Sequence, residues 1–442
     1  MGSFQARISS AILGRIRKRR RSPAVAEPSL NNDPRKVPPA KMREVTFADF
    51  DGVARLKARS GMVADSLENW NRLWRANPAL RGLVNRPAGW VLEAEGEIVG
   101  YLGNISLQCR YGDSALNAVA SHGFCADPPY RALTFSLASA FYRQTSVDFF
   151  VSSTAIESSG KMALAFKCAA LPQPDYDTVL LWVLRPYSFA QMLVRKLDVQ
   201  PGLAAIATAI AGLAIAADKI FRKRRPRLTS HIFAVIESSI DQIDGEIAAL
   251  WTDKLKESSR LYTDRSPEAL RWHFGIPGDQ GSVRVLRCYE NEKLMGYAVV
   301  RSDKDAQDGI RRSIIADLIA RHDNSAVVQA LWVAAYEHAK NIGSDILEVQ
   351  GFPATIREVS SAWRPYRRKY PACPYYYRAT DPVLQKELND PSAWYACAYD
   401  GDASLIRPSS SISTLRFGPA PKSVTQSEKA VALAEVQGTG VV

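Results

Sequence analysis

An internal repeat constrains the fold of this chain more than any other feature, because the order of features in residues 66–101 returns about 200 residues later. In the first copy, Ser66 precedes a helix-like segment with aromatic residues on one face, and a proline and a hairpin pattern that ends in Gly-Tyr at positions 100–101 follow. In the second copy, Ser266 takes the place of Ser66, and the hairpin pattern ends in Gly-Tyr at positions 296–297. A shared order of this length is typical of a duplicated domain.

Both copies continue with strand patterns separated by a helix. The segments 115–126 and 311–320 have the apolar patterning of strands, and each precedes a helical pattern and then a second strand, at 147–154 and 345–352. Strand and helix patterns in this order indicate mixed sheets with helices on both sides. We therefore expect an α/β (α+β) protein with two tandem mixed-sheet domains.

Composition sets the boundaries that we expect between the parts of the chain. The five expected parts are a basic tail and linker at 1–41, a first domain at 42–200, an apolar and basic connection at 201–227, a second domain at 228–403, and a C-terminal tail at 404–442. The last part is rich in Ser and Pro, so we expect it to be disordered.

The connection begins with seventeen residues, 201–217, that carry no charge. A spanning helix needs ~20 predominantly apolar residues and is favoured by Leu, Ile and Phe, whereas this segment is largely Ala and Gly. Because paired halves of one fold are expected to share a compartment, we predict a connecting helix that is buried or lies along a membrane surface, not one that spans it.

The net charge of +12 is concentrated at the N-terminus. Residues 1–43 carry eleven Lys or Arg against two acidic residues, a net of +9, so only +3 remains for the other 399 residues. A near-neutral folded body argues against nucleic acid as a partner.

The first residues also have an apolar periodicity. Large apolar side chains recur at every fourth position beside the basic cluster, at Phe4, Ile8, Ile12 and Ile16. This pattern is typical of a small amphipathic helix on an anionic membrane surface, and a disordered basic tail is the alternative. With the first interpretation, the protein is cytoplasmic and peripheral on the inner face of the cell membrane.

The cysteines and histidines give no support to a metal site. The six cysteines include no C-x-x-C pair, and none of the five histidines is paired at a four-residue spacing. These patterns indicate a reducing compartment and no structural zinc, so we expect no metal.

A candidate phosphate-binding turn lies in "SHGFCADPPYRALTFS", residues 121–136, which reads as a strand, an Asp-Pro-Pro turn and the start of a helix. A helix N-terminus offers unpaired N–H donors and a partial positive charge, so phosphate groups bind there. The residues of this turn are Arg131, Ala132, Leu133, Thr134, Phe135 and Ser136. The alternative is a turn that merely caps a core helix.

This order of elements, with an acidic residue, proline and an aromatic residue before Arg131, resembles the GCN5-related N-acetyltransferase family. It is most similar to bacterial proteins with two such domains in tandem, over residues 42–180 and 228–380. The resemblance implies two acyl-CoA N-acyltransferase-like domains, with the coenzyme A pyrophosphate at the turn 131–136 and with Phe124 and Cys125 beside it.

The turn departs from the family pattern at two positions. Thr134 and Ser136 stand where the family has Gly and Gly or Ala, and their hydroxyls are able to donate to phosphate. The equivalent segment of the second half, 318–331, has no Arg-x-x-Gly. We therefore expect that the second half has lost the cofactor site and serves as a scaffold or as the acceptor-binding half.

Acyl transfer from a thioester to an amine needs a base for the ammonium proton, donors for the oxyanion and an acid for the thiolate. His122, on the strand that enters the turn, is the candidate base, because imidazole titrates near neutral pH; a histidine hydrogen-bonded inside the sheet is the alternative. Glu157 follows the next strand, where the family places groups that contact the acceptor; an exposed carboxylate is the alternative.

The usual acid of the family has no counterpart here. Many members have a tyrosine on the following helix, whereas this chain has Phe166 there, so Tyr130 or water would have to serve. Cys125 has no evident His-Asp relay, which favours a small core residue over a nucleophile.

The function that the resemblance implies is direct transfer of an acyl group, from acetyl-CoA or another acyl-CoA, to a small-molecule amine such as an amino sugar or an envelope precursor. Two alternatives stay open. One is a Fem-type aminoacyltransferase, which has twin domains of this fold and takes its acyl group from a charged tRNA, although the near-neutral body argues against it. The other is a non-catalytic binding protein that keeps the fold.

Overall fold

The computed structural model describes residues 37–83, 86–197, 199–228, 232–276, 282–303, 309–369, 374–402 and 404–405. The chain divides into two units, Met1–Pro39 and Ala40–Val442, and all helices and strands below belong to the second. Most of the N-terminal tail and residues 406–442 lie outside the described residues, so the expectations for the two tails stay predictions.

The first sheet contains strands from both ends of the sequence. Its path is β1 (Lys41–Glu44), β2 (Gly89–Ala94), β3 (Glu97–Tyr111), β4 (Ser114–Ala126), β5 (Phe149–Ser152), β15 (Tyr376–Ala379) and β6 (Ala169–Ala170), with β9 (Leu261–Thr263) paired to β3. The pair β4–β5 is parallel, and the other pairs are antiparallel.

The second sheet repeats this topology. Its path is β8 (Ala234–Ser238), β10 (Val283–Glu290), β11 (Lys293–Asp303), β12 (Arg312–Ala320), β13 (Ile346–Val349), β7 (Thr178–Val183) and β14 (Tyr366–Lys369). Again one pair, β12–β13, is parallel. The mixed sheets match the fold class predicted from the internal repeat.

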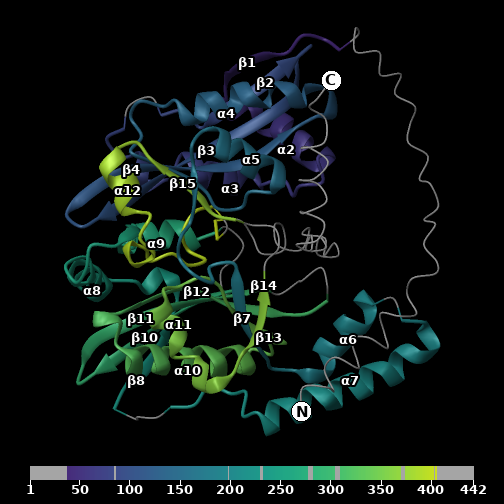
Figure 1. The fold of residues 1–442 in the computed structure, drawn as a ribbon, viewed down its shortest axis with the longest axis vertical. Helices are drawn as coiled ribbons and strands as arrows, with labels where there is room; N and C mark the ends of the chain where they lie inside the picture. The colour runs from purple at the N-terminus through teal and green to yellow at the C-terminus, as the bar shows by residue number, and fades with distance from the viewer. Residues whose placement is uncertain are drawn as a thin grey trace, which may run out of the picture. The chain divides into compact units, whose positions relative to one another are not determined.

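Each sheet contains at least one strand from the other half of the sequence, and besides β9 one interior strand is exchanged in each direction. β7 comes from the first half of the sequence but lies in the second sheet, between β13 and β14. β15 comes from the second half but lies in the first sheet, between β5 and β6. Figure 1 shows β15, coloured yellow-green, with the blue strands, and the blue β7 with the green ones. Neither half of the sequence therefore holds a complete sheet.

Helices connect and cover the strands. In the first half they are η2 (Phe47–Asp49), α2 (Phe50–Arg59), α3 (Leu67–Trp74), η3 (Pro78–Leu80), η4 (Pro128–Leu133), α4 (Thr134–Tyr142), α5 (Glu157–Ala165), α6 (Pro186–Lys196) and α7 (Pro201–Phe221). In the second half they are η5 (Ile240–Gln242), α8 (Gly245–Leu255), α9 (Pro267–Phe274), η6 (Arg321–Asp323), α10 (Ser325–Asn341), α11 (Ala354–Glu358), η7 (Ser361–Trp363), α12 (Pro382–Glu387) and η8 (Pro391–Ala393).

Local sequence signals explain the helix starts and hairpins of both copies. The Ser66 hydroxyl caps α3 by accepting from the Asn69 N–H, and Ser266 caps α9 in the same way. The β2–β3 turn has two residues with positive φ, Glu95 at 50° and Gly96 at 80°, as two-residue hairpin turns that match strand twist require. The predicted caps and hairpins are confirmed.

The connecting helix α7 is exposed, so the expectation that it is buried is wrong. Among the described residues it is the helix that is long and apolar enough to cross a membrane, with a mean hydropathy of 1.8 over an 18-residue window, of which 11% is buried. Its Leu, Ile and Phe side chains point largely to solvent. The alternative expectation, a helix along a membrane surface, stays a prediction.

The end of the described chain packs inside the protein. Ser404 and Leu405 belong to the segment expected to be a disordered tail, yet Leu405 is fully buried and Ser404 is 7% exposed. Leu405 is part of the apolar core of the first sheet, with Trp70 and Trp394. The C-terminal segment therefore contributes to the surroundings of the first sheet.

Candidate functional site

Strands β4 and β5 separate at their carboxyl ends. They pair at three positions, the last of which joins Ala120 to Val151. Beyond that pair β4 continues to Ala126, while β5 ends at Ser152. The carboxyl ends of neighbouring parallel strands are a common place for ligand sites, so the gap between them is a candidate site.

A β-bulge lies in β4 at this gap. The register pairs Gly103 with His122 and Tyr101 with Cys125, so two residues of β4 stand opposite the single residue Leu102. Gly123, in the bulge, has a φ of +64°, and a Cβ at this position would lie 2.7 Å from Cε of Lys57. A bulge re-aims side chains and leaves a residue outside the regular pairing, here directly after His122.

The predicted base, His122, lies in a buried network of charged groups. Its Nε2 is 3.2 Å from Nζ of Lys57 in α2 and 3.4 Å from Oδ2 of Asp65, which precedes α3. Its Nδ1 is 3.4 Å from Oδ2 of Asp402 in the C-terminal segment. Lys57 and Asp65 form an ion pair of 2.6 Å, and the His122 side chain is 3% exposed.

Opposing effects set the pKa of His122. Burial and the Lys57 ammonium lower it, whereas the hydrogen bonds to Asp402 and Asp65 raise it, and the result lies above the ordinary value of 6.5. Burial raises the pKa of Asp65, but Lys57 and His122 outweigh burial and hold this pKa well below its usual range. The network therefore favours an ionised Asp65 beside a histidine whose protonated form is stabilised.

The carboxylate of Asp402 bridges the two separating strands. It accepts a hydrogen bond of 2.7 Å from Ser153 and one of 3.0 Å from Thr154, both directly after β5, and it contacts His122 on β4. Asp402 is 1% exposed. The chain's own C-terminal segment thus occupies the gap, and His122 is enclosed in this conformation.

A chain of amide and guanidinium groups extends this network. Asn69 donates to Asp65 over 3.0 Å, and Arg72 donates to the Asn69 side-chain oxygen over 2.9 Å. Arg72 also donates to the carbonyl of Leu405 over 3.0 Å. This network therefore holds the C-terminal segment at both Asp402 and Leu405.

The predicted phosphate-binding turn is helical in this structure. The 3₁₀ helix η4 runs directly into α4, and the Tyr130 N–H donates to the Asp127 carbonyl over 2.9 Å. The Thr134 N–H donates to the carbonyl of Arg131. The turn lies where the sequence predicts it, but part of its donor set is used within the turn, because 3₁₀ bonds satisfy N–H groups near a helix start.

The two hydroxyls of the turn have backbone partners. Thr134 Oγ1 donates to the Arg131 carbonyl and Ser136 Oγ to the Leu133 carbonyl, each over 2.6 Å. Donation to a phosphate would require these hydroxyls to rotate away from those carbonyls. Four residues of the turn have exposed side chains, namely Arg131, Ala132, Leu133 and Phe135, and two candidates on β4 are half-buried, namely Phe124 and Cys125.

The N-terminus of α4 differs from that of its counterpart α10. The side chain of Asn324 caps α10 by accepting from the N–H groups of Ala326 and Val327. The preceding Asp323 adds a carboxylate, which pairs with Lys254 and Arg260. In contrast, α4 has no side-chain cap among the described residues. A phosphate at α10 would meet N–H donors that the Asn324 side chain already occupies and a carboxylate, whereas at α4 no side chain of the described residues caps the first N–H groups.

Glu157 is not brought to the network. It is the first residue of α5, its side chain is 85% exposed, and its ion pair is with Lys161 at 2.8 Å. Lys161 lowers the pKa of Glu157 through a hydrogen bond and charge attraction. Among the described residues, Glu157, the candidate acceptor contact, therefore pairs with Lys161, whereas His122, the candidate base, belongs to the buried network.

The remaining candidates lie in apolar surroundings. Tyr130 is 8% exposed within an apolar cluster beside α4. Phe166 stacks on Phe135 of α4, with ring centroids 5.1 Å apart, and so covers the helix that follows the turn. Burial raises the pKa of the Cys125 thiol to about 11, against partial lowering by Lys57, so Cys125 is protonated at neutral pH and is not an activated nucleophile.

Sequence reasoning missed Lys57, Asp65 and Asp402. For Lys57 a signal existed, because it occupies an inward position of the helical pattern formed with the buried Val53 and Leu56. For Asp402 no local signal existed, since it lies 280 residues from His122.

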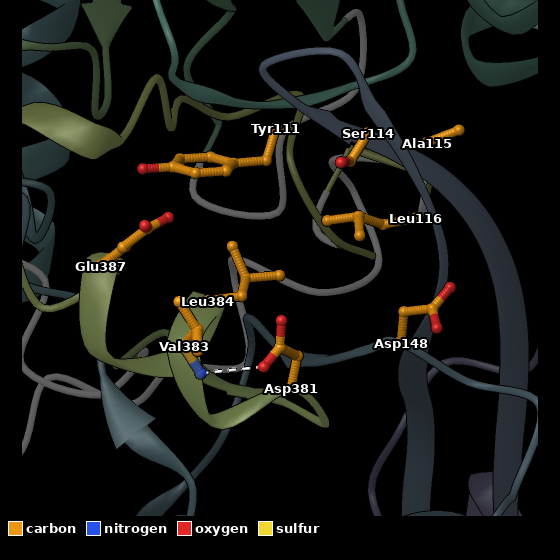
Figure 2. Close-up of a pocket in the computed structure, with 9 residues that line it drawn as sticks. All are labelled: Tyr111, Ser114, Ala115, Leu116, Asp148, Asp381, Val383, Leu384 and Glu387. Carbon is orange, nitrogen blue, oxygen red and sulfur yellow. Dashed lines mark hydrogen bonds between the residues drawn. The ribbon is translucent and has the colours of Figure 1, made fainter.

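A cavity of about 380 Å³ lies at the opposite end of β4, beside Ser114 and Leu116 (Figure 2). His122 lies six positions after Leu116 along the strand, a distance of ~20 Å at ~3.3 Å per residue. Figure 2 shows three carboxylates around it, of which Asp381 accepts from the Val383 N–H and so caps α12. We therefore separate this cavity from the candidate site.

No group of three or more His, Cys, Asp or Glu side chains that could hold a metal ion occurs among the residues that the structure describes. The buried network around His122 includes the ammonium group of Lys57, which would repel a cation.

Solved structures share this fold. A GCN5-related N-acetyltransferase from Anabaena variabilis is 11% identical over 78% of this chain and 73% of that chain, with a TM-score of 0.49. A GCN5-related N-acetyltransferase from Kribbella flavida is 11% identical over 78% and 72%, with a TM-score of 0.47. An Enterococcus faecalis protein, described as a probable N-acyltransferase, is 8% identical over 77% and 72%, with a TM-score of 0.50.

No protein-family model matches the sequence, and no curated protein matches it. The likeness to the Enterococcus faecalis structure, at 8% identity, shows the fold alone and leaves the chemistry to be argued from the site. The chain shares its fold with this probable N-acyltransferase, and the mixed-sheet fold class that the resemblance predicted is confirmed.

Proposed function

We propose that this protein is an acyl-CoA-dependent N-acyltransferase, which transfers an acetyl or other acyl group to the amine of a small molecule. The observation that carries the proposal is the difference between the two related helix starts. The N-terminus of α4 has no side-chain cap among the described residues and follows the bulged strand β4, whereas Asn324 caps α10. Such an uncapped helix start suits the pyrophosphate of coenzyme A.

In this proposal the cofactor lies against the turn 131–136. The first-turn N–H groups of α4 supply donors, and the exposed Arg131 adds a charge-assisted hydrogen bond to a phosphate oxygen. The half-buried Phe124 and Cys125, beside the bulge, are assigned to the acyl-bearing arm of the cofactor. The second half serves as a scaffold or as the acceptor-binding half.

The chemistry that we assign to the gap between β4 and β5 is direct attack of an amine on the thioester. His122, oriented by Asp402, takes the proton of the attacking ammonium. A backbone N–H of the bulge at Gly123 supports the developing oxyanion. Tyr130 or water then protonates the departing thiolate. Because Asp402 encloses His122, the acceptor reaches the ring only after the C-terminal segment moves aside.

A non-catalytic acyl-CoA-binding protein is the second candidate. The observation that favours it is the state of His122, whose two ring nitrogens both have side-chain partners and whose exposure is 3%. Such a histidine is also consistent with a purely structural polar network. The third candidate, a Fem-type aminoacyltransferase that depends on tRNA, has no comparable support from the described residues.

For the acceptor, we keep amino sugars and envelope precursors as the proposed class. We also propose a cytoplasmic protein that lies on the inner face of the cell membrane. The tandem form of the fold and the exposed apolar helix α7 support both proposals.

Calorimetric titration of the full chain with coenzyme A tests cofactor binding. We expect binding that Arg131→Ala weakens by ~1–2 kcal/mol, about 5- to 30-fold, because one charge-assisted hydrogen bond is lost. Thr134→Pro should abolish binding, since the proline ring occupies the phosphate position. Arg143→Ala is the matched control, because Arg143 is exposed at the other end of the same helix. Binding that survives Thr134→Pro in a folded protein contradicts the assigned site.

Release of the free thiol from acetyl-CoA, measured with a panel of amines, tests catalysis. We expect His122→Gln to reduce turnover while coenzyme A affinity is kept, because the histidine is assigned to proton transfer and not to the phosphates. Coenzyme A binding without turnover on any amine would support the second candidate. A folded protein that binds no coenzyme A would contradict both candidate functions.

A further inference from the structure

The positive charge of the folded part is concentrated in one helical hairpin. Residues 185–227, which contain α6 and α7, carry nine basic and two acidic residues, a net of +7. With +9 in residues 1–43, the total of +12 leaves a net of −4 for all other residues. The hairpin is thus a basic region on an otherwise weakly acidic body.

One face of α7 is an exposed apolar stripe. Its members follow each other at helical spacings and are 58–84% exposed, namely Leu203, Ile206, Ile210, Leu213, Ile220 and Phe221. The opposite face packs on the protein, where Thr208 and Gly212 are buried and a Cβ on Gly212 would lie 3.4 Å from the Tyr187 backbone. The stripe is therefore the outward face of a helix that is fixed from behind.

Contacts to the second sheet fix the C-terminal half of α7. Asp218 accepts from the hydroxyl of Tyr366 in β14 and from Arg224, each over 2.6 Å. Lys219 donates to the carbonyl of Leu184, directly after β7, over 3.4 Å. Directly after the stripe lies a cluster of exposed basic residues, namely Arg222, Lys223, Arg225 and Arg227.

Strand pairing excludes a spanning role for α7 in this fold. The chain enters the hairpin from β7 and leaves it toward β8, and both strands belong to the second sheet. A single crossing would place strands of one sheet on opposite sides of a bilayer. The other helix of the hairpin, α6, has 11 residues and a length of ~17 Å, too short for a return across ~30 Å of hydrocarbon.

We propose that α7 docks the protein on an anionic lipid bilayer, with its axis parallel to the surface. The six stripe residues enter the boundary between headgroups and acyl chains, and the basic cluster contacts anionic headgroups. An anionic bilayer is the partner because its negative headgroups complement the basic region that adjoins the stripe. This proposal is independent of the acyl-transfer chemistry.

Vesicle flotation of the full chain tests the proposal, with phosphatidylcholine vesicles that do or do not contain phosphatidylglycerol. We expect salt-sensitive binding to the anionic vesicles, and extraction by alkaline carbonate. Ile206→Glu/Ile210→Glu should weaken binding more than tenfold, since it places two carboxylates in the apolar face. Ala205→Glu is the control, because Ala205 is exposed on the same helix but outside the stripe.

The basic cluster has its own variant. Lys223→Gln/Arg227→Gln should weaken binding to anionic vesicles about 25-fold, since one basic residue near such a surface contributes ~1 kcal/mol, about fivefold. The same variant should leave the weak binding to neutral vesicles unchanged.

Photolabelling of the wild-type chain by a diazirine lipid separates α7 from the basic N-terminal tail and needs no variant to fold. We expect labelled peptides from residues 201–221. Labelling confined to residues 1–36, or binding that survives the double Glu change, overturns the proposal. If the wild-type protein is a dimer that the double Glu change dissociates, the stripe binds a second copy of the chain, and the proposal is overturned. If alkaline carbonate does not extract the protein, the helix is inserted into the bilayer, and the proposal is also overturned.

Discussion

The Nδ1 atom of His122 lies 3.4 Å from a carboxylate oxygen of Asp402, although 280 residues separate the two in the sequence. The same carboxylate accepts hydrogen bonds from Ser153 and Thr154. One residue near the end of the described chain therefore joins β4 to the residues after β5, where these strands separate. The closed state of the candidate site depends on this residue.

Asp402→Asn should change the pH dependence of stability. Because the pKa of His122 is raised in the folded protein, its contribution is fully present below the unfolded pKa and is lost as pH rises through the folded pKa. Asn removes the carboxylate whose hydrogen bond helps to raise this pKa. We expect a cost of ~1–3 kcal/mol below the unfolded pKa of His122 and a smaller fall in unfolding free energy as pH rises from there through the raised folded pKa.

Urea unfolding at several pH values measures this effect. Glu157→Gln is the matched control, because it makes the same change on an exposed side chain and should alter neither stability nor its pH dependence. An unchanged pH slope in Asp402→Asn would show that His122 is not coupled to Asp402.

Lys57→Met should be strongly destabilising. Lys57 is 2% exposed and pairs with the buried Asp65, so its loss leaves a carboxylate without its ammonium partner, at a cost of ~3–5 kcal/mol. In a double-mutant cycle, Lys57→Met/Asp65→Asn should cost less than the sum of the single changes. Lys161→Met, which breaks an exposed pair, should give no measurable change in denaturant unfolding. If the stability costs of the two single changes simply add in the double variant, Lys57 and Asp65 are not coupled.

Gly123→Ala should cost more stability than Gly96→Ala. Both glycines have positive φ, but a Cβ on Gly96 meets nothing within 4 Å, whereas one on Gly123 lies 2.7 Å from Cε of Lys57. Lys57 cannot move away without disturbing its ion pair with Asp65. We expect an additional cost of ~1–3 kcal/mol for Gly123→Ala, measured by thermal or denaturant unfolding. Equal costs would mean that the bulge accommodates a Cβ.

Residues 42–200 and residues 228–403 should not fold when each is expressed alone. The first fragment lacks β15, and the second lacks β7, so each sheet would lose an interior strand. We expect no cooperative unfolding transition for either fragment by circular dichroism, and recovery of a soluble complex on co-expression. A fragment that unfolds cooperatively alone would contradict the structural importance of the strand exchange.

Local chemistry made part of this fold predictable. Ser66 and Ser266 cap their helices through hydrogen bonds to residues three positions away, and Glu95 and Gly96 form a turn that two residues specify. The same local signals, which return in the same order about 200 residues later, indicated the duplicated domain. The turn 131–136 was located in the same way, because a strand, a proline turn and a helix start are adjacent in sequence.

The sequence by itself thus determined the elements, their duplication and the position of the candidate turn. Only the tertiary structure decided that β7 and β15 exchange sheets, and that Lys57, Asp65 and Asp402 surround His122. The physical reason is the range of the interactions. A strand offers the same backbone hydrogen bonds to any neighbour, so its partner is selected by packing over the whole sheet. A buried charge is likewise recognisable only from the opposite charge that the fold brings to it.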